Sequence, residues 1–239
     1  MKFAVPNFDV LNDFSGYIDG VKLSIPGNQW FIANSFIPYF HSKGINLYVE
    51  TLPEIMVRKR AEGSPISIGN LRINFKPEIV CINNHFSKGI KIRDKFDFVS
   101  DNITLIYRTK KPQNLCDLKN YRSAIPNPRT SNIGIQFKKL YEKNCEYFGN
   151  LKNKVFLSSA HYREIPAMFL NDEIDYGVMW ESEAIYWKFK HFSPFKSADS
   201  TFSIMLLEDS GETALKIFNE FKSGNISNFY SKYKFKLLI

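Results

Sequence analysis

The stretch VKLSIPGNQWFIANSFIPYFHSKGINLYV, residues 21–49, decides the fold class. Apolar and polar residues alternate over Val21–Ile25, which is typical of a strand, and Pro-Gly-Asn then ends that strand. Apolar side chains recur at helical spacing over Gln29–Ser42, so this segment predicts a helix that Asn28 caps and Pro38 kinks or interrupts. Because Ile45–Val49 alternates again, the stretch predicts a strand, a helix and a second strand.

The alternation of strands and helices continues along the chain. Glu54–Ala61 predicts a short helix, and the nearly continuous apolar run Glu78–Ile82 predicts a strand buried on both faces. Asn102–Arg108 is a further β-rich segment, and the order restarts after the polar break Thr109–Pro112. The remaining predicted strands are Tyr121–Pro126, Val155–Leu157, Tyr176–Trp180 and Phe202–Leu207, and the remaining predicted helices are Ile133–Glu142, His161–Leu170, Gly211–Lys222 and Ile226–Tyr233.

Two α/β halves accommodate this order better than one continuous sheet. We therefore predict an α/β protein of two lobes, each a mostly parallel sheet flanked by helices. We expect a two-strand hinge to join the lobes and the ligand cleft to lie between them. Lobe 1 is discontinuous and comprises residues 1–108 and 189–239, while lobe 2 comprises residues 109–188. The Thr109–Pro112 break and the Glu183–Trp187 stretch mark the two crossings.

The composition is that of a globular protein with a basic excess. Hydrophobic residues make up 44% and charged residues 23% of the 239 residues, which excludes wholesale disorder and fibrous repeats. Lysine and arginine number 32 against 24 acidic residues, and the net charge of +8 favours an anionic partner. The basic residues are scattered, and the densest group, Val57–Arg60, is interpreted as a solvated helix face. We therefore expect no nucleic-acid partner.

Three cysteines, Cys81, Cys116 and Cys145, lie far apart, which excludes a dense disulfide framework and a cysteine zinc site. We expect all three to be buried free thiols. No stretch has the roughly 18 consecutive apolar residues of a membrane helix, and residues 1–20 show no apolar leader. Two locations stay open: the extracellular or periplasmic side if a leader or anchor is missing from this chain, and the cytoplasm otherwise.

Several of these segments together resemble the type II periplasmic binding proteins. In the stretch Asp172–Trp180 an acidic turn leads a strand, as it does in that family. The similarity is nearest to the molybdate and sulfate binders, particularly those with a His-Tyr/His-Arg-Glu-x-Pro stretch, here His161–Pro166. Family members normally carry a leader peptide or lipid anchor, which this sequence does not show. The other segments that carry the resemblance are Val21–Leu52, Leu105–Arg108 with Asp117–Lys119, Ala124–Pro128 and Phe218–Phe235.

The candidate site residues follow the ends of predicted strands, where the family holds its ligand and where open α/β sheets place ligands generally. Helices that begin there aim unpaired N–H groups and the positive end of the helix dipole at the ligand, which suits an oxyanion. The predicted ligand-binding residues are Gly27, Asn28, Gln29, Asn83, Asn84, Arg129, Thr130, Ser131, His161, Arg163, Trp180 and Glu181.

Structural roles compete with ligand binding at most of these positions. Asn28, Thr130 and Ser131 are also good helix N-caps, and Trp180 also suits the core of its lobe. A cation at Arg163, in the first turn of a predicted helix, requires an anionic partner, which is either the ligand or a carboxylate. The candidate carboxylates are those of Glu164, Glu181 and Glu183.

The resemblance implies that the protein captures a small anion by closure of its two lobes, as the binding component of an ABC-type uptake system with a permease as partner. The leading ligand class is a tetrahedral oxyanion such as molybdate, tungstate or sulfate, and a carboxylate is preferred if Arg163 or Arg129 faces the cleft. The alternative is a cytoplasmic enzyme or sensor of the same fold acting on a small carboxylate metabolite, with His161 and Glu164 as the best acid–base pair. We expect a monomer without catalytic residues, metal or cofactor.

Overall fold

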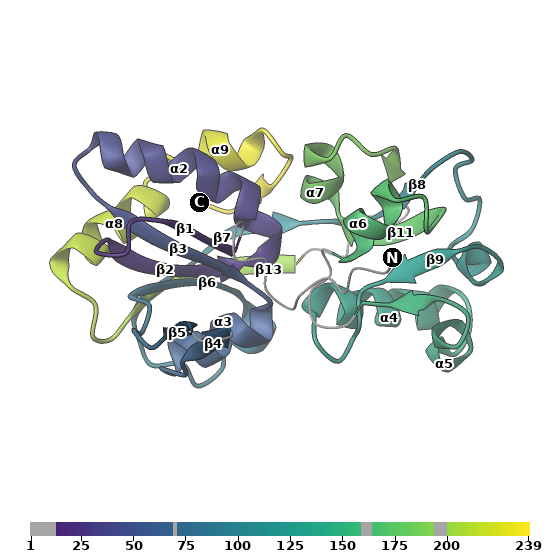
Figure 1. The fold of residues 1–239 in the computed structure, drawn as a ribbon, viewed down its shortest axis with the longest axis horizontal. Helices are drawn as coiled ribbons and strands as arrows, with labels where there is room; N and C mark the ends of the chain where they lie inside the picture. The colour runs from purple at the N-terminus through teal and green to yellow at the C-terminus, as the bar shows by residue number, and fades with distance from the viewer. Residues whose placement is uncertain (1–12, 69–70, 159–163, 194–199) are drawn as a thin grey trace. The chain divides into compact units, whose positions relative to one another are not determined.

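The computed structural model describes residues 13–68, 71–158, 164–193 and 200–239. The chain divides into two compact units, Met1–Ser100 with Thr201–Ile239 and Asp101–Ser200. Each unit contains a sheet flanked by helices (Figure 1), which confirms the predicted α/β class. The chain changes units at residues 100 and 200, whereas the sequence placed the lobe borders at residues 108 and 188, and those borders stay a prediction.

The first unit is built on a seven-stranded mixed sheet in the order β1-β3-β2-β6-β13-β7-β14. β2 pairs in parallel with β3 and β6, so the carboxyl ends of these three strands lie at one edge. β1 pairs antiparallel with β3, β13 with β6, and β14 with β7. The bounds are β1 (Phe14–Gly16), β2 (Val21–Pro26), β3 (Leu47–Leu52), β6 (Ile79–Asn83), β7 (Ile92–Asp101), β13 (Ser200–Leu207) and β14 (Lys236–Leu237).

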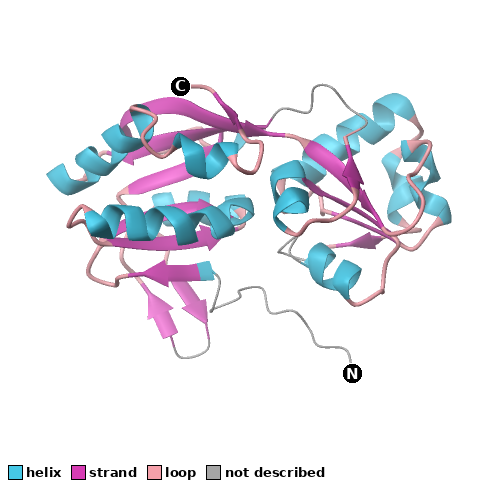
Figure 2. Ribbon diagram, turned by 90° about the horizontal axis from the view of Figure 1, so that it is seen from above, coloured by secondary structure: helices cyan, strands magenta, loops and turns pink. Residues whose placement is uncertain are grey.

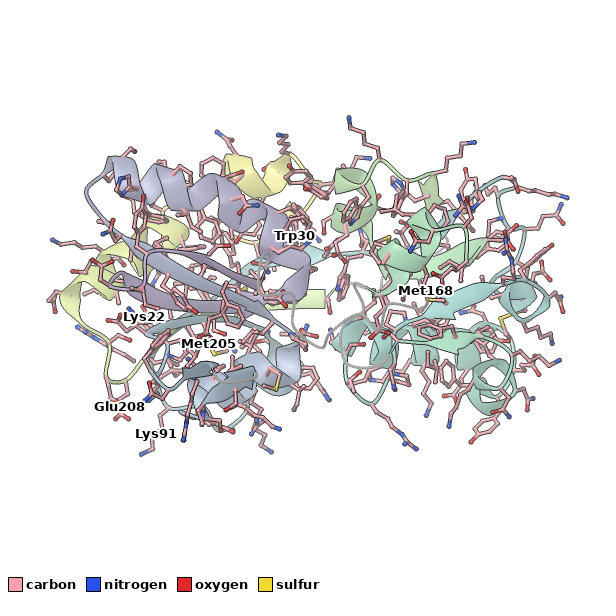
Figure 3. All side chains as sticks on the ribbon, in the orientation of Figure 1. Lys22, Trp30, Lys91, Met168, Met205 and Glu208 are labelled. Atoms are coloured by element: carbon pink, nitrogen blue, oxygen red, sulfur yellow. A yellow bond between two sulfur atoms is a disulfide. The ribbon has the colours of Figure 1, made fainter. Side chains whose placement is uncertain are left out.

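Helices cover both faces of this sheet, with α2 and α9 on one face and α3 and the β4–β5 hairpin on the other (Figure 1). Met205, labelled in Figure 3, belongs to the core cluster between α3 and the sheet, together with Val57 and Val80. The helical segments are η1 (Gly27–Gln29), α2 (Trp30–Ser42), α3 (Glu54–Ala61), η2 (Asn84–Phe86), α8 (Glu212–Lys222) and α9 (Ser227–Ser231), and the hairpin strands are β4 (Ile66–Ile68) and β5 (Leu71–Ile73).

For α2, the expected Asn28 cap and an interruption at Pro38 are wrong, and a kink at Pro38 stays a prediction. The residue that precedes the helix is Gln29 and not Asn28, and no side chain caps the first turn. The helix also continues through Pro38 to Ser42 without interruption. A proline inside a helix removes one hydrogen bond, but Phe36 and Phe40 on the buried face hold the helix against the core on both sides of it.

Phenylalanine rings join the helices of the first unit to its sheet. Phe221 on α8 packs against Phe36 and Phe40 of α2, with ring centroids 5.8 and 6.2 Å apart, and against Phe98 of β7 at 5.4 Å. All four rings are fully buried. Edge-to-face and stacked ring pairs add stabilisation beyond their buried area. Much of the aromatic content therefore belongs to the core.

The second unit has a five-stranded mixed sheet in the order β10-β9-β11-β8-β12. β9 pairs in parallel with β10 and β11, and β8 pairs antiparallel with β11 and β12. Helices and strands of both units can be followed in Figure 2. The bounds are β8 (Ile103–Tyr107), η3 (Leu115–Asn120), β9 (Ser123–Ile125), α4 (Asn132–Asn144), α5 (Phe148–Lys152), β10 (Phe156–Leu157), α6 (Glu164–Leu170), β11 (Tyr176–Trp180), α7 (Glu181–Tyr186) and β12 (His191–Phe192).

The basic group Val57–Arg60 is only partly the solvated helix face that the sequence predicted. Arg60 is fully buried and forms an ion pair with Glu50 of β3, whose carboxylate is also buried. The guanidinium Nη2 and Nε lie 2.8 and 2.9 Å from the two carboxylate oxygens. Arg60 therefore neutralises a buried acid.

The expectation of three free thiols is wrong for two of the cysteines. Cys116 of η3 and Cys145, which follows α4, form a disulfide across 29 positions of the chain. Cys81 is free and buried. The pairing depends on the packing of η3 against the end of α4, which spacing alone does not indicate. In the described part of the chain, no helix is both long and apolar enough to span a membrane.

Candidate ligand-binding site

Five of the predicted site residues lie at the carboxyl edge of the first unit's sheet. Gly27–Gln29 form η1 directly after β2, and Asn83 and Asn84 lie at the end of β6. β2 and β6 are parallel neighbours, so the topology brings these two segments to the same edge. β13 runs antiparallel to β6, and its first residues, including Thr201, therefore join them. Trp30, labelled in Figure 3, begins α2 next to η1.

The side chain of Gln29 builds this edge from the inside. Gln29 is fully buried, its Oε1 accepts a hydrogen bond of 3.1 Å from the Tyr230 hydroxyl, and its Nε2 donates to the Cys81 sulfur at 3.4 Å. Burial raises the pKa of the Cys81 thiol to about 12, so this thiol is neutral and unreactive. Gly27 and Asn28 are buried as well. Gln29 thus ties η1 to β6 and α9.

The two asparagines after β6 also have structural partners. Asn83 donates from Nδ2 to the Thr201 carbonyl at 2.9 Å, and its Oδ1 accepts the His85 N–H at 2.9 Å. Asn84 is exposed and donates from Nδ2 to Asp97 Oδ1 at 3.1 Å. The Ser203 hydroxyl and the Asn84 amide hold the pKa of Asp97 below its usual range. Asn83 therefore fixes the β6–β13 edge, and Asn84 belongs to a surface polar cluster.

In the second unit, the turn between β9 and α4 lies at the carboxyl edge of the sheet. The Asn127 carbonyl accepts the N–H groups of Thr130 and Ser131, each at 3.1 Å. The Asn127 side chain accepts the Arg129 N–H at 3.0 Å, and the Ser158 hydroxyl, which follows β10, accepts the Asn127 N–H at 3.1 Å. The turn is therefore held by its own hydrogen bonds, and Arg129 remains exposed.

Ser131 is the N-cap of α4, one of the two roles that the sequence left open for it. Its hydroxyl accepts the Gly134 N–H at 3.2 Å and lies 3.0 Å from the Asn127 carbonyl oxygen. A Cβ at Gly134 would lie 2.6 Å from the Asn127 carbonyl carbon, so the residue must be glycine for the helix to start this close to the turn. The first turn of α4 is thus anchored at the end of β9.

The acidic side chains near the end of β11 accept hydrogen bonds from neighbouring residues. Trp180 is 2% exposed and belongs to the core. Glu181 accepts from Asn102 Nδ2 at 3.1 Å, and its Oε1 lies 3.9 Å from His191 Nε2. Ser182 donates its hydroxyl to Asp101 at 2.5 Å. Because these groups are acceptors, this end of the edge favours a cation or a hydrogen-bond donor over an anion.

Two predicted site residues, His161 and Arg163, lie outside the described residues. The choice between a ligand and a carboxylate as the partner of Arg163 therefore stays a prediction. Glu164, which begins α6, is buried. Among the described residues, no three His, Cys, Asp or Glu side chains gather as metal ligands.

The sequence did not predict several polar residues that the fold places at the carboxyl edge of the second unit's sheet. Asn132 opens α4, and its Nδ2 donates to the Ser200 hydroxyl, as does Gln136 Nε2. Asn127 organises the turn, and Ser158 supports it. Asn127 and Ser158 each follow closely on the end of a parallel strand, and this position in the sequence was the available signal. Ser200 gave none, because 68 positions separate it from Asn132.

No family model and no curated protein sequence matches this chain, but solved structures do. The chain is similar to the periplasmic molybdate-binding protein of Azotobacter vinelandii, at 12% identity and a TM-score of 0.71, over 92% of this chain and 100% of that one. It is similar to the sulfate-binding protein SubI of Mycobacterium tuberculosis H37Rv, at 16% identity and a TM-score of 0.69, over 92% of this chain and 86% of that one. It is also similar to the regulatory domain of Synechocystis PCC6803 CcmR in complex with 2-PG, at 9% identity and a TM-score of 0.62, over 85% of this chain and 95% of that one.

These matches confirm the resemblance that the sequence predicted, at the level of the fold. The chain has the fold of the type II periplasmic binding proteins. Proteins that share this fold include oxyanion-binding proteins and regulatory domains. At sequence identities of 9–16%, the similarity shows the fold alone.

Proposed function

We propose that this chain binds a small anion and that the turn before α4 forms the central part of its site. The observation that carries the proposal is the start of α4, a helix of 13 residues that begins at the carboxyl edge of the sheet directly after the Asn127–Ser131 turn. The first N–H groups of a helix have no preceding helical carbonyl to which they can donate, and the dipole there is positive. Together they favour an anion without a buried cation.

A tetrahedral oxyanion is the ligand class that we favour. The fold is shared with molybdate- and sulfate-binding proteins, which supports this choice. The half-buried Thr130 hydroxyl lies beside the helix start, where it is 3.4 Å from the Asn127 carbonyl oxygen, and hydroxyl and N–H donors suit an oxyanion with several acceptor oxygens. The net charge of +8 is compatible with such a ligand.

We assign the chain to solute capture for uptake, with an ABC-type permease as its partner. The Cys116–Cys145 disulfide supports this assignment, because disulfides persist in oxidising compartments outside the cytoplasm. Closure of the two units on the ligand is part of the proposal. A decrease in the radius of gyration on ligand addition, measured by small-angle scattering, tests that part separately.

A ligand screen by thermal shift tests the proposal. The full chain is melted with molybdate, tungstate, sulfate, phosphate and a set of small carboxylates at constant ionic strength. A ligand at 100 times its Kd stabilises the folded state by about 2.7 kcal/mol, which corresponds to a rise in Tm on the order of 5–10 °C for a chain of this size. No stabilisation by any anion, with stabilisation by divalent metals instead, would overturn the proposal.

The variant Thr130→Val localises the binding. We expect it to weaken oxyanion affinity about tenfold in calorimetric titrations, because it removes one hydroxyl donor to a charged ligand and preserves the side-chain shape. Thr109→Val is the matched control, since Thr109 is an exposed threonine of the same unit. Equal affinities of Thr130→Val and Thr109→Val would remove the turn from the site.

A ligand-sensing role is the second candidate, and the similarity to the CcmR regulatory domain favours it. The same screen separates the two. A thermal shift produced only by small organic carboxylates supports a sensor of metabolites, whereas a shift produced by molybdate, tungstate or sulfate supports oxyanion capture. An enzymatic role on such a metabolite has as its best acid–base pair His161 and Glu164, the first of which lies outside the described residues.

A further inference from the structure

A pocket of about 580 Å³ lies within the second unit, along α4 and beside α5, which are neighbours in Figure 1. It shares one residue, Arg129, with the ligand-binding residues predicted from the sequence. Its volume falls in the range of small-molecule sites. Residues 135, 138, 139 and 142 of α4 line it at helical spacing, so one face of this helix forms a wall.

The rim of the pocket carries an excess of positive charge. Four cations line it, Arg129, Lys138, Lys139 and Lys152, against one carboxylate, that of Glu142. Lys138 lies 4.0 Å from Glu142, while within the described residues Arg129, Lys139 and Lys152 form no ion pair. With Glu142 next to Lys138, the other three cations around the cavity repel one another unless a further anion lies among them. The rim therefore matches an anionic group.

The floor of the pocket is apolar and aromatic. Ile135, Phe148 and Leu157 line it, and Phe148 is buried. Tyr147 is 71% exposed although its ring has a defined seat: a Cβ at Gly149 would lie 2.4 Å from Tyr147 Cε1, so the ring lies directly over that glycine. An aromatic face that stays exposed beside an apolar floor matches a flat or apolar body.

We propose that this pocket binds an amphipathic organic anion, with an aromatic or aliphatic body on Tyr147, Ile135 and Leu157 and a carboxylate, sulfonate or phosphate group at Arg129, Lys139 and Lys152. The site belongs to one unit and shares residues 127–129 of the turn with the proposed anion site, while the rest of its lining comes from α4, from α5 with the preceding Tyr147, and from Leu157. Arg129 serves this pocket, which explains why the turn leaves its side chain exposed.

Fluorescence titration of the full chain with the aromatic sulfonate 1-anilinonaphthalene-8-sulfonate tests the proposal. We expect saturable binding of one equivalent. The ionic strength is held constant, because salt screens exposed charges. The double variant Lys139→Gln/Lys152→Gln should weaken binding of the sulfonate about tenfold, since charge-assisted contacts are lost. It should change binding of the uncharged analogue N-phenyl-1-naphthylamine less than twofold. Tyr147→Ala should weaken binding of both probes.

Lys143→Gln is the matched control, because Lys143 is an exposed lysine of α4 outside the pocket lining. It should leave sulfonate affinity within twofold of the wild type. Equal losses in Lys143→Gln and the double variant would show a general charge effect and overturn the proposal, as would the absence of saturable binding. Thr130→Val should leave the sulfonate affinity unchanged, so failure of this pocket and failure of the oxyanion site are distinguishable. Thermal melts confirm that each variant is folded.

Discussion

Replacement of Arg60 by methionine should destabilise the first unit more than any ordinary surface change. Both charged side chains are buried, with 0% of the Arg60 and 1% of the Glu50 side chain exposed. Arg60 also donates to the carbonyl of Ser64 at 2.7 Å and to that of Phe75. Arg60→Met therefore leaves a buried carboxylate without its cation and removes the Arg60 donor from three carbonyls, those of Ser64, Ile73 and Phe75. Breaking a buried pair in this way costs about 3–5 kcal/mol.

Urea denaturation followed by far-UV circular dichroism measures this loss. With a slope of about 2 kcal/mol/M, the midpoint of the first unit's transition should fall by about 1.5–2.5 M. Lys59→Met is the matched control, because Lys59 is the exposed neighbour on the same helix, and its effect should stay within about 0.5 kcal/mol. The double variant Glu50→Gln/Arg60→Met should recover part of the loss, since it buries no charge.

A loss below about 1 kcal/mol for Arg60→Met would refute the reasoning, because it would mean that water or another cation reaches Glu50. A double variant less stable than Arg60→Met alone would also contradict it. In that case the cost would come from packing around the long side chain and not from the unpaired carboxylate.

Three further changes test the structure independently. Replacing Cys116 and Cys145 together by serine opens a loop of about 30 residues, which should cost about 3.6 kcal/mol in the chain-entropy model, and reversible urea unfolding with and without reductant measures it. Gly134→Ala forces a Cβ into the preceding turn and should cost about 1–3 kcal/mol while weakening anion binding, and a fully stable variant would contradict the close approach. Ser203→Ala should raise the pKa of Asp97 towards its usual value, and carbon NMR titration of Asp97 measures this change. The ionised Asp97 contributes stability above the usual carboxyl range, and this contribution is lost as the pH falls. We expect the contribution to be smaller in the variant.

Much of the fold could be predicted because short-range patterns carry it. The alternation in Val21–Ile25 and Ile45–Val49 became β2 and β3, and the helical spacing between them became α2. The pattern did not show that β2 is covered on both faces, where even Ser24 is fully buried. Alternation reports which residues tolerate water, whereas burial of a polar residue depends on the layer that packs on top of it.

The candidate site was predictable by position and less so by role. Strand ends are visible in the sequence, so Asn83 and the Asn127–Ser131 turn could be placed at the carboxyl edges. Whether a polar side chain there faces a ligand or a neighbouring element could not be predicted. The Gln29 side chain accepts a hydrogen bond from Tyr230, which lies 201 positions away, and the Asn83 side chain donates one to the carbonyl of Thr201.

The sequence by itself determined the α/β class and the order of the main strands and helices, and several of its segments carried the resemblance to the type II periplasmic binding proteins. The class and the element order follow from periodicity over a few residues, which each segment carries independently of the rest of the chain. The tertiary structure alone decided that Cys116 pairs with Cys145 and that Arg60 neutralises Glu50. Such pairs form only when packing brings distant segments into contact. The physical reason is that a thiol or a charge has no partner until the fold supplies one.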